Sequence, residues 1–142
     1  MRWPDLLAGL ADALKTCLPD FVVVDGTWAK VPSVDAIHLQ LKRETPAGHG
    51  FRHFLILIDV FCREAAGTTD RQAYTRMDQH QLLVEQMIEA FKASHGTVTG
   101  VSIQAWEPDG GAFRPTWAAR LSVQFTCIVT DDLCGGASAL PV

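Results

Sequence analysis

The feature of this sequence that most constrains its fold is the segment HFLILIDVFCR, which runs from His53 to Arg63. Almost every position in it is apolar, yet Asp59 lies near its middle. Side chains along a β-strand point to opposite faces in turn, so a half-buried strand alternates between apolar and polar residues. This segment does not alternate, and it is far shorter than a helix that spans a bilayer. It therefore predicts a β-strand with apolar side chains on both of its faces.

The preceding segment, AIHLQLKRE at 36–44, is typical of a half-buried strand. Its residues Ile37, Leu39 and Leu41 share one face, and polar residues occupy the other. A loop that contains Gly and Pro joins it to the apolar strand, which we expect over 51–62. These two segments predict a long β-hairpin.

A second hairpin is predicted near the C-terminus, where two alternating segments flank the turn-rich stretch EPDGGAFRPT. The first covers 101–106, and its residues Val101, Ile103 and Ala105 are expected to face the core, with the following tryptophan on the other face. The second covers 121–129 and alternates in the same way.

Two helices are predicted from residues spaced three and four apart. The first covers 5–18, where leucines recur at intervals of four, and a short strand is expected just after it at 21–24. The second covers about 70–94 and begins at Thr69-Asp-Arg-Gln72, a sequence typical of a capping box.

The predicted order of elements is therefore α-β-ββ-α-ββ. It indicates an α+β fold of two layers, with a mixed or antiparallel sheet built from two long β-hairpins and two main helices packed on one face. The length of 142 residues suits a single domain spanning 1–142. Residues 131–142 lack periodicity and are expected to form an extended or mobile C-terminal tail.

The apolar strand raises the question of what covers its second face. If every second residue of this strand faces the helices, four residues are left on the opposite face of the sheet. Two explanations stay open for these four. In the first, a part of the same chain folds over them, either the loop 25–35, with Trp28 and Val31, or the C-terminal tail. In the second, a neighbouring subunit covers them. In the second case they form a subunit interface, in which the carboxylate pairs with an Arg or Lys across the contact. The four residues are Leu55, Leu57, Asp59 and Phe61.

Charge and cysteine content narrow the possible partners. The net charge is −4, and the 12 Lys and Arg residues are scattered, so a specific grip on nucleic acid is disfavoured, although DNA can pass such a surface loosely. The four cysteines form no CxxC pair and suit free thiols in a reducing compartment. No segment predicts a membrane span or a signal peptide.

Motifs for catalysis or cofactor binding are not found in the sequence. The five histidines form no HxH or HExxH pattern, and no glycine-rich phosphate loop is present. The residues therefore support no catalytic claim and no metal site. The rival hypothesis is a ligand-binding or catalytic domain, with a pocket between sheet and helices near His53, Trp106 and Trp117.

The two predicted hairpin loops, 45–53 and 107–117, each combine Gly and Pro with a Phe-Arg pair. Aromatic and Arg side chains are common anchors in protein interfaces. We therefore interpret the loops as contact sites for other proteins. The candidate contact residues are His49, Phe51, Arg52, Phe113, Arg114 and Trp117.

Taken along the chain, these segments resemble the tail terminator (tail completion) proteins of long-tailed bacteriophages. The likeness rests on a first helix ending in LPDFVVVDG, the strands AIHLQLKRE and FRHFLILIDVFCRE, the helix DRQAYTRMDQHQLLVEQMIEAF, and the closing segments VSIQAWEPDG and WAARLSVQFTCIVTDD. It covers nearly the whole chain through element order and texture, and no short diagnostic motif carries it.

The resemblance implies a virion protein with no enzyme activity and no cofactor, located at the head-proximal end of the tail and assembled in the host cytoplasm. Such a protein forms a homo-oligomeric ring, typically a hexamer, on the last ring of tail-tube protein. The ring stops growth of the tube and offers a surface to the head-tail connector protein, and DNA passes through its lumen without specific binding. Another connector or a head-completion protein is the alternative within the same class of particle.

Overall fold

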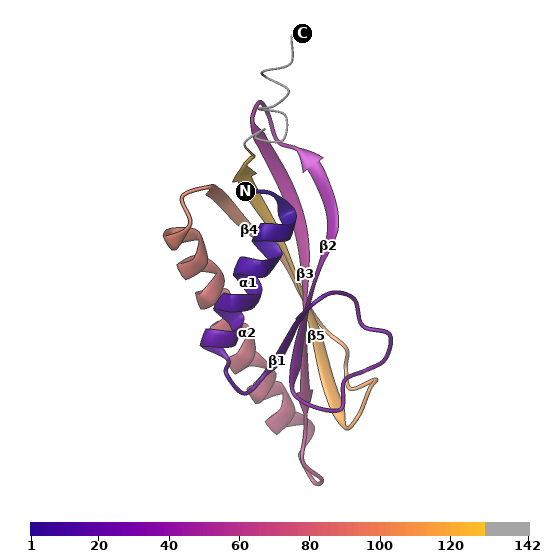
Figure 1. Cartoon of the computed structure of the whole chain (residues 1–142). Coiled ribbons are helices and arrows are strands. Elements are labelled where there is room, and N and C mark those ends of the chain that lie inside the picture. Colours follow the sequence, from indigo (N-terminus) through magenta and orange to yellow (C-terminus); the bar gives the residue numbers. More distant parts are fainter. Residues whose placement is uncertain (130–142) are drawn as a thin grey trace, which may run out of the picture.

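A computed structural model of the chain describes residues 1–129. It has two helices on one face of a five-stranded sheet, as Figure 1 shows. The elements are α1 (Trp3–Cys17), β1 (Val22–Asp25), β2 (Ala36–Pro46), β3 (Phe51–Arg63), α2 (Asp70–Ser94), β4 (Val98–Pro108) and β5 (Thr116–Ile128). The expected order α-β-ββ-α-ββ and the α+β class are confirmed. The expectation of an extended or mobile tail at 131–142 concerns residues outside the described range.

The sheet is mixed, with the strand order β1-β2-β3-β5-β4. β1 runs parallel to β2, and the other neighbours are antiparallel. The apolar strand β3 is the central one, paired along its length with β2 and β5. A central strand has no edge open to water, which is consistent with its apolar composition.

The core lies between the helices and the inner face of the sheet. Leucines at intervals of four on α1 (Leu6, Leu10 and Leu14) are fully buried. The alternate residues of β3 from Phe54 to Cys62 are buried against them. Burial of each such side chain contributes about 1.5–3 kcal/mol to folding, so this layer dominates the stability of the domain.

The two helices begin in different ways. At α2 the predicted capping box forms, because the Thr69 hydroxyl accepts from the Gln72 amide at 3.2 Å and the Gln72 side chain accepts from the Thr69 amide at 2.9 Å. At α1 no side chain caps the first turn, and Pro4 occupies it instead. Proline is favoured there because its missing N–H would have no partner within the helix. Within residues 1–129, neither helix combines the length and the apolar character of a membrane span.

For β4, the prediction of which residues face the core was wrong after Ile103. The register of β4 against β5 shifts between Ile103 and Ala105, so that Ala105 lies opposite Ser122 and Trp106 lies opposite Leu121. Trp106 therefore packs on the core, and Ala105 faces away from it. A β-bulge inserts one extra residue into a strand, and this reverses the facing of every residue after it.

Candidate functional site

The candidate site is the sheet face that carries no helix, which we call the outer face. At one end of it the loop between β1 and β2 folds over the sheet. The Trp28 ring packs edge-on against Phe61 with ring centroids 5.1 Å apart, and Val31 joins the same cluster. Phe61 is fully buried in its own chain, between Ala36 and Ala118. Phe61 is therefore covered by the loop 25–35 of its own chain, which is the first of the two explanations given above.

Asp59 is neutralised within the same chain. Arg120, its cross-strand partner on β5, donates from Nε to Oδ1 at 2.7 Å and from Nη2 to Oδ2 at 3.1 Å. The Trp28 indole donates a third hydrogen bond to Oδ2 at 3.0 Å. The hydrogen bond to Asp59 raises the pKa of Arg120, against the opposing effect of burial. The cation expected from a neighbouring subunit is thus supplied by Arg120, and Asp59 is only 4% exposed.

The remainder of the outer face, which we call the open half, is lined mostly by uncharged side chains; the exception is the exposed Arg43, which a register shift in β2 places opposite Leu55. Leu55 is half-buried in its centre on β3, and Leu57, toward the covered end, is only 5% exposed. His53 and Thr126 share a hydrogen bond of 2.8 Å across β3 and β5. The strand registers place the other members of the open half beside these leucines: Gln40, Ser102, Ser122 and Gln124.

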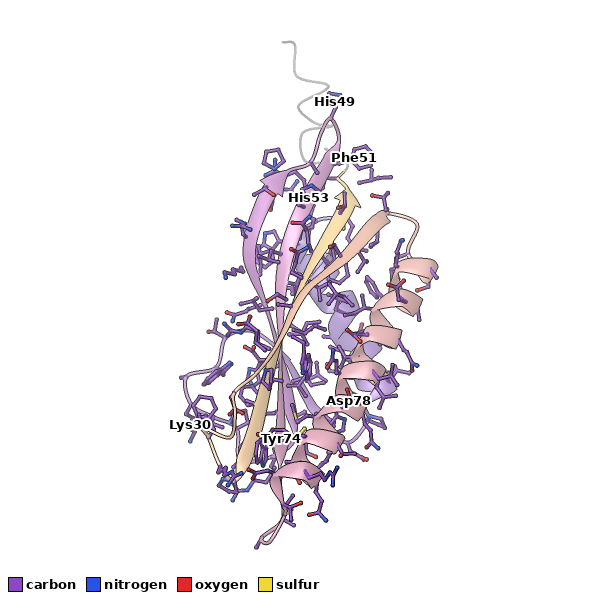
Figure 2. All side chains as sticks on the ribbon, turned by 180° about the vertical axis from the view of Figure 1, so that it is seen from behind. Lys30, His49, Phe51, His53, Tyr74 and Asp78 are labelled. Carbon is purple, nitrogen blue, oxygen red and sulfur yellow. The ribbon has the colours of Figure 1, made fainter. Side chains whose placement is uncertain are left out.

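The six candidate loop residues divide into two sets at opposite ends of the sheet. Phe51 pairs with Ile128 at one end of β3, and Arg63 pairs with Thr116 at the other. Twelve residue steps at about 3.3 Å each separate these ends by roughly 40 Å. Figure 2 shows His49, Phe51 and His53 together at one end, with Lys30 and Tyr74 toward the other. A single small partner cannot touch both sets.

Phe51 and Phe113 are 37% and 39% exposed, and His49 is exposed at the turn. Phe113 also packs edge-on against Trp28, with ring centroids 6.1 Å apart. Arg52 is paired with Glu44 at 2.9 Å.

The other two residues are engaged within the chain. Arg114 lies over the Trp117 ring at 4.7 Å and is paired with Asp70. Trp117 is only 4% exposed and packs edge-on against Tyr74, so its ring is not free to meet a partner.

The pocket of the rival hypothesis does not form from its three residues. Trp106 and Trp117 pack on the helix side of the sheet, whereas His53 lies on the outer face beside Thr126. Trp117 is also near the far end of β5 from His53, since it pairs with Cys62.

The described residues form other hollows, which sequence reasoning missed. A cavity of about 250 Å³ lies beside the Asp59–Arg120 pair, bounded by Trp28 and Phe113. A larger groove of about 560 Å³ runs between α1 and α2. Leu83, an apolar residue that α2 leaves exposed, lines this groove.

The titratable groups of the interior show no sign of catalytic activation. Burial raises the pKa of the Cys62 thiol to about 12 and that of Cys127 to about 11, which suppresses thiolate chemistry. Burial, followed by the charge of Arg76, lowers the pKa of His80. Over residues 1–129, no group of three or more His, Cys, Asp and Glu side chains is placed to hold a metal ion.

Comparison with known proteins gives little. No protein-family model and no curated protein matches the chain. The chain is similar to a chain of a solved structure described as "Virion of native gene transfer agent (GTA) particle". The two share 11% sequence identity with a TM-score of 0.44, over 86% of this chain and 93% of the other. A likeness this distant carries no argument about function.

Proposed function

We propose that this chain is a structural virion protein that forms a ring on the end of a phage-type tail tube, stops polymerisation of the tube and joins it to the head connector. The observation that carries the proposal is the open half of the outer face. A lumen that passes DNA without holding it needs a surface with few cations, because Lys and Arg bind phosphates strongly. On β4 and β5 the polar residues of this half are Ser102, Ser122, Gln124 and Thr126, whereas the cation Arg43 lies on β2. The chain as a whole has an excess of acidic residues.

The proposed contact with a neighbouring subunit lies on the β2 and β3 side of the same face, which leaves the polar β4 and β5 side for the lumen. Leu55 is its centre, and Leu57 supports it from below because it is nearly buried. Asp59 and Phe61 act indirectly in this proposal, since they hold the Trp28 loop that borders the contact. Each subunit would use two different patches, which is the geometry that closes a ring.

The two ends of the sheet supply the two further surfaces that such a ring requires. One end presents His49 and Phe51, and the other presents Phe113 beside Arg114. Because they lie roughly 40 Å apart, they suit two partners on opposite sides of the ring, one the tail-tube protein and one the connector.

The test is the length of tail tubes assembled in vitro. Tube subunits from the same particle are polymerised with and without this protein, and tube lengths are measured by electron microscopy. We expect the protein to shorten the tubes and to remain bound at one end. Tubes of unchanged length with unbound protein would contradict the proposal. Addition to isolated connectors, with no effect on tubes, would favour the alternative of a connector or head-completion protein.

A further inference from the structure

The groove between α1 and α2 is an apolar surface that the described residues leave open. Its walls are mainly carbon, and its volume is about 560 Å³. The exposed fraction of Leu83, which lines it, is 39%. An apolar hollow of this size on a small domain is typical of a binding surface. The principal lining residues are Ala13, Cys17, Leu83, Met87, Ala90 and Phe91.

The chain leaves the described fold beside one end of this groove. Ser94 and His95 line that end, and the Val98 amide donates to the His95 carbonyl at 2.9 Å. The Ile128 amide donates to the Thr97 carbonyl at 2.8 Å, so the end of β5 lies two residues from the groove wall. Val129, the last described residue, packs against the core on the helix side of the sheet. The last described residue therefore lies near one end of the groove.

The residues that follow have the composition of an occupant. The sequence after Val129 is TDDLCGGASALPV, in which the ten residues from Leu133 to Val142 carry no charged side chain. Three residues, 130–132, span about 10 Å when extended. The lining residues Leu83 to His95 cover twelve helical steps, or about 18 Å at 1.5 Å each. Six extended residues cover that length, so ten are enough.

We propose that residues 133–142 of the same chain occupy the α1/α2 groove and shield Leu83, Met87 and Phe91 from water. The occupant is chosen by three observations: its point of departure, its length and its lack of charge. Its small residues, Gly135 to Ala139, suit a narrow channel between two helices. This inference does not depend on the virion role, because it concerns a contact within one chain.

Cys17 in the groove gives a direct readout in the native protein. Its side chain is partly exposed, whereas Cys62 and Cys127 are buried. Alkylation of Cys17 is followed by peptide mass spectrometry in the full chain and in a chain ending at Asp132. If the groove is filled about nine-tenths of the time, the full chain reacts about tenfold more slowly at Cys17. Cys62 and Cys127 must stay unlabelled in both, which shows that both are folded. Rates within about twofold of each other would overturn the proposal.

Cross-linking tests the position of the segment. In a chain that carries Cys134→Ser and Ala139→Cys, mild oxidation at high dilution should join Cys17 to the thiol introduced at position 139, because about six extended residues bring the segment from His95 to Leu83, beside Cys17. The chain with Cys134→Ser alone should give no product. Leu83→Asp, in the groove wall, should reduce the yield strongly, while Leu82→Asp, an exposed neighbour outside the groove lining, should leave it unchanged. An equal yield in both Asp variants would show random collision of a free tail and overturn the proposal. A link between two chains would overturn the placement within one chain.

Discussion

At the scale of single residues, the structure explains how a carboxylate sits in an apolar strand. A buried charge is costly unless it is paired and hydrogen-bonded. Asp59 meets this condition through Arg120 on the neighbouring strand and through Trp28 from the covering loop. The triad therefore joins two strands and a loop, and it fixes the loop that buries Phe61.

Removal of Arg120 should destabilise the fold more than neutralisation of Asp59. Arg120→Met leaves a buried carboxylate with only the indole as donor, and we expect it to lower the free energy of unfolding by about 2 kcal/mol. Asp59→Asn keeps an acceptor and frees a guanidinium that is 40% exposed, so about 1 kcal/mol is expected. Urea unfolding followed by tryptophan fluorescence measures both.

The matched control is Glu107→Gln, which changes the charge of the exposed residue opposite Arg120 on β4 and should shift the free energy of unfolding by less than about 0.5 kcal/mol. If Arg120→Met unfolds at the same urea concentration as the unmodified chain, the Asp59–Arg120 pair does not contribute to stability, and the prediction is wrong.

His80 should make the fold sensitive to mild acid. Both of its ring nitrogens are buried without a hydrogen-bond partner, Phe21 packs edge-on against it, and Arg76 lies nearby. Because its pKa in the folded state is below the ordinary value of 6.5, protons bind the unfolded chain first as pH falls. His80 therefore leaves the free energy of unfolding unchanged at pH values above about 6.5 and lowers it as the pH falls below that value.

His80→Met should remove this part of the decline. The measurement compares unfolding of the two chains at about pH 7.5 and about pH 5.5. Gln79→Met, at the preceding exposed position, should keep the decline of the unmodified chain. Equal declines in the His80 variant and the unmodified chain would show that His80 is not the group responsible.

At the scale of elements, periodicity predicted what depends on nearby residues. The leucine spacing of α1, the capping box of α2 and the alternation of β2 and β5 are local signals, and the structure agrees with them. The fold class followed from their order. The bulge at Gln104 was not predictable, because one inserted residue leaves the apolar content of β4 unchanged while it reverses the facing of Trp106.

The crossing of the two helices depends on a glycine. A side chain at Gly9 would place its Cβ 3.0 Å from Cε1 and 3.2 Å from Cζ of Phe91. Gly9→Val should lower the free energy of unfolding by about 2 kcal/mol, although valine is the better helix former, because overpacking outweighs propensity.

Ala8→Val, on the exposed face of the same turn, should cost about 0.5 kcal/mol through its lower helix propensity alone. Thermal or urea unfolding distinguishes the two variants. A stabilised Gly9→Val chain would mean that Phe91 moves aside without penalty.

At the scale of the whole molecule, long-range pairing set the limit of sequence reasoning. The sequence alone predicted that the outer side of β3 needs cover, and it offered either the Trp28 loop or another subunit. It could not choose, because Trp28, Asp59 and Arg120 lie far apart in the chain and meet only through the fold. The loop covers one half of the outer face, and the open half remains for assembly.

Self-association should depend on Leu55 and folding on Leu57. Leu55→Asp is expected to change the free energy of unfolding by less than about 1 kcal/mol, since the site is partly solvated. Leu57→Asp places a charge at a position that is 5% exposed and should cost about 3 kcal/mol or more. Mass measured by light scattering, with tube subunits present, should show rings for the unmodified chain and monomers for Leu55→Asp. Rings formed equally well by Leu55→Asp would remove this residue from the contact.

The most direct test of the proposed role is electron microscopy of the purified protein mixed with tail-tube subunits of its own particle. We expect one ring of this chain at one end of each tube, with Leu55 in the contact between neighbouring subunits and the β4 and β5 side of the open half turned toward the lumen. Bare tube ends, with the protein remaining as free monomers, would contradict the account.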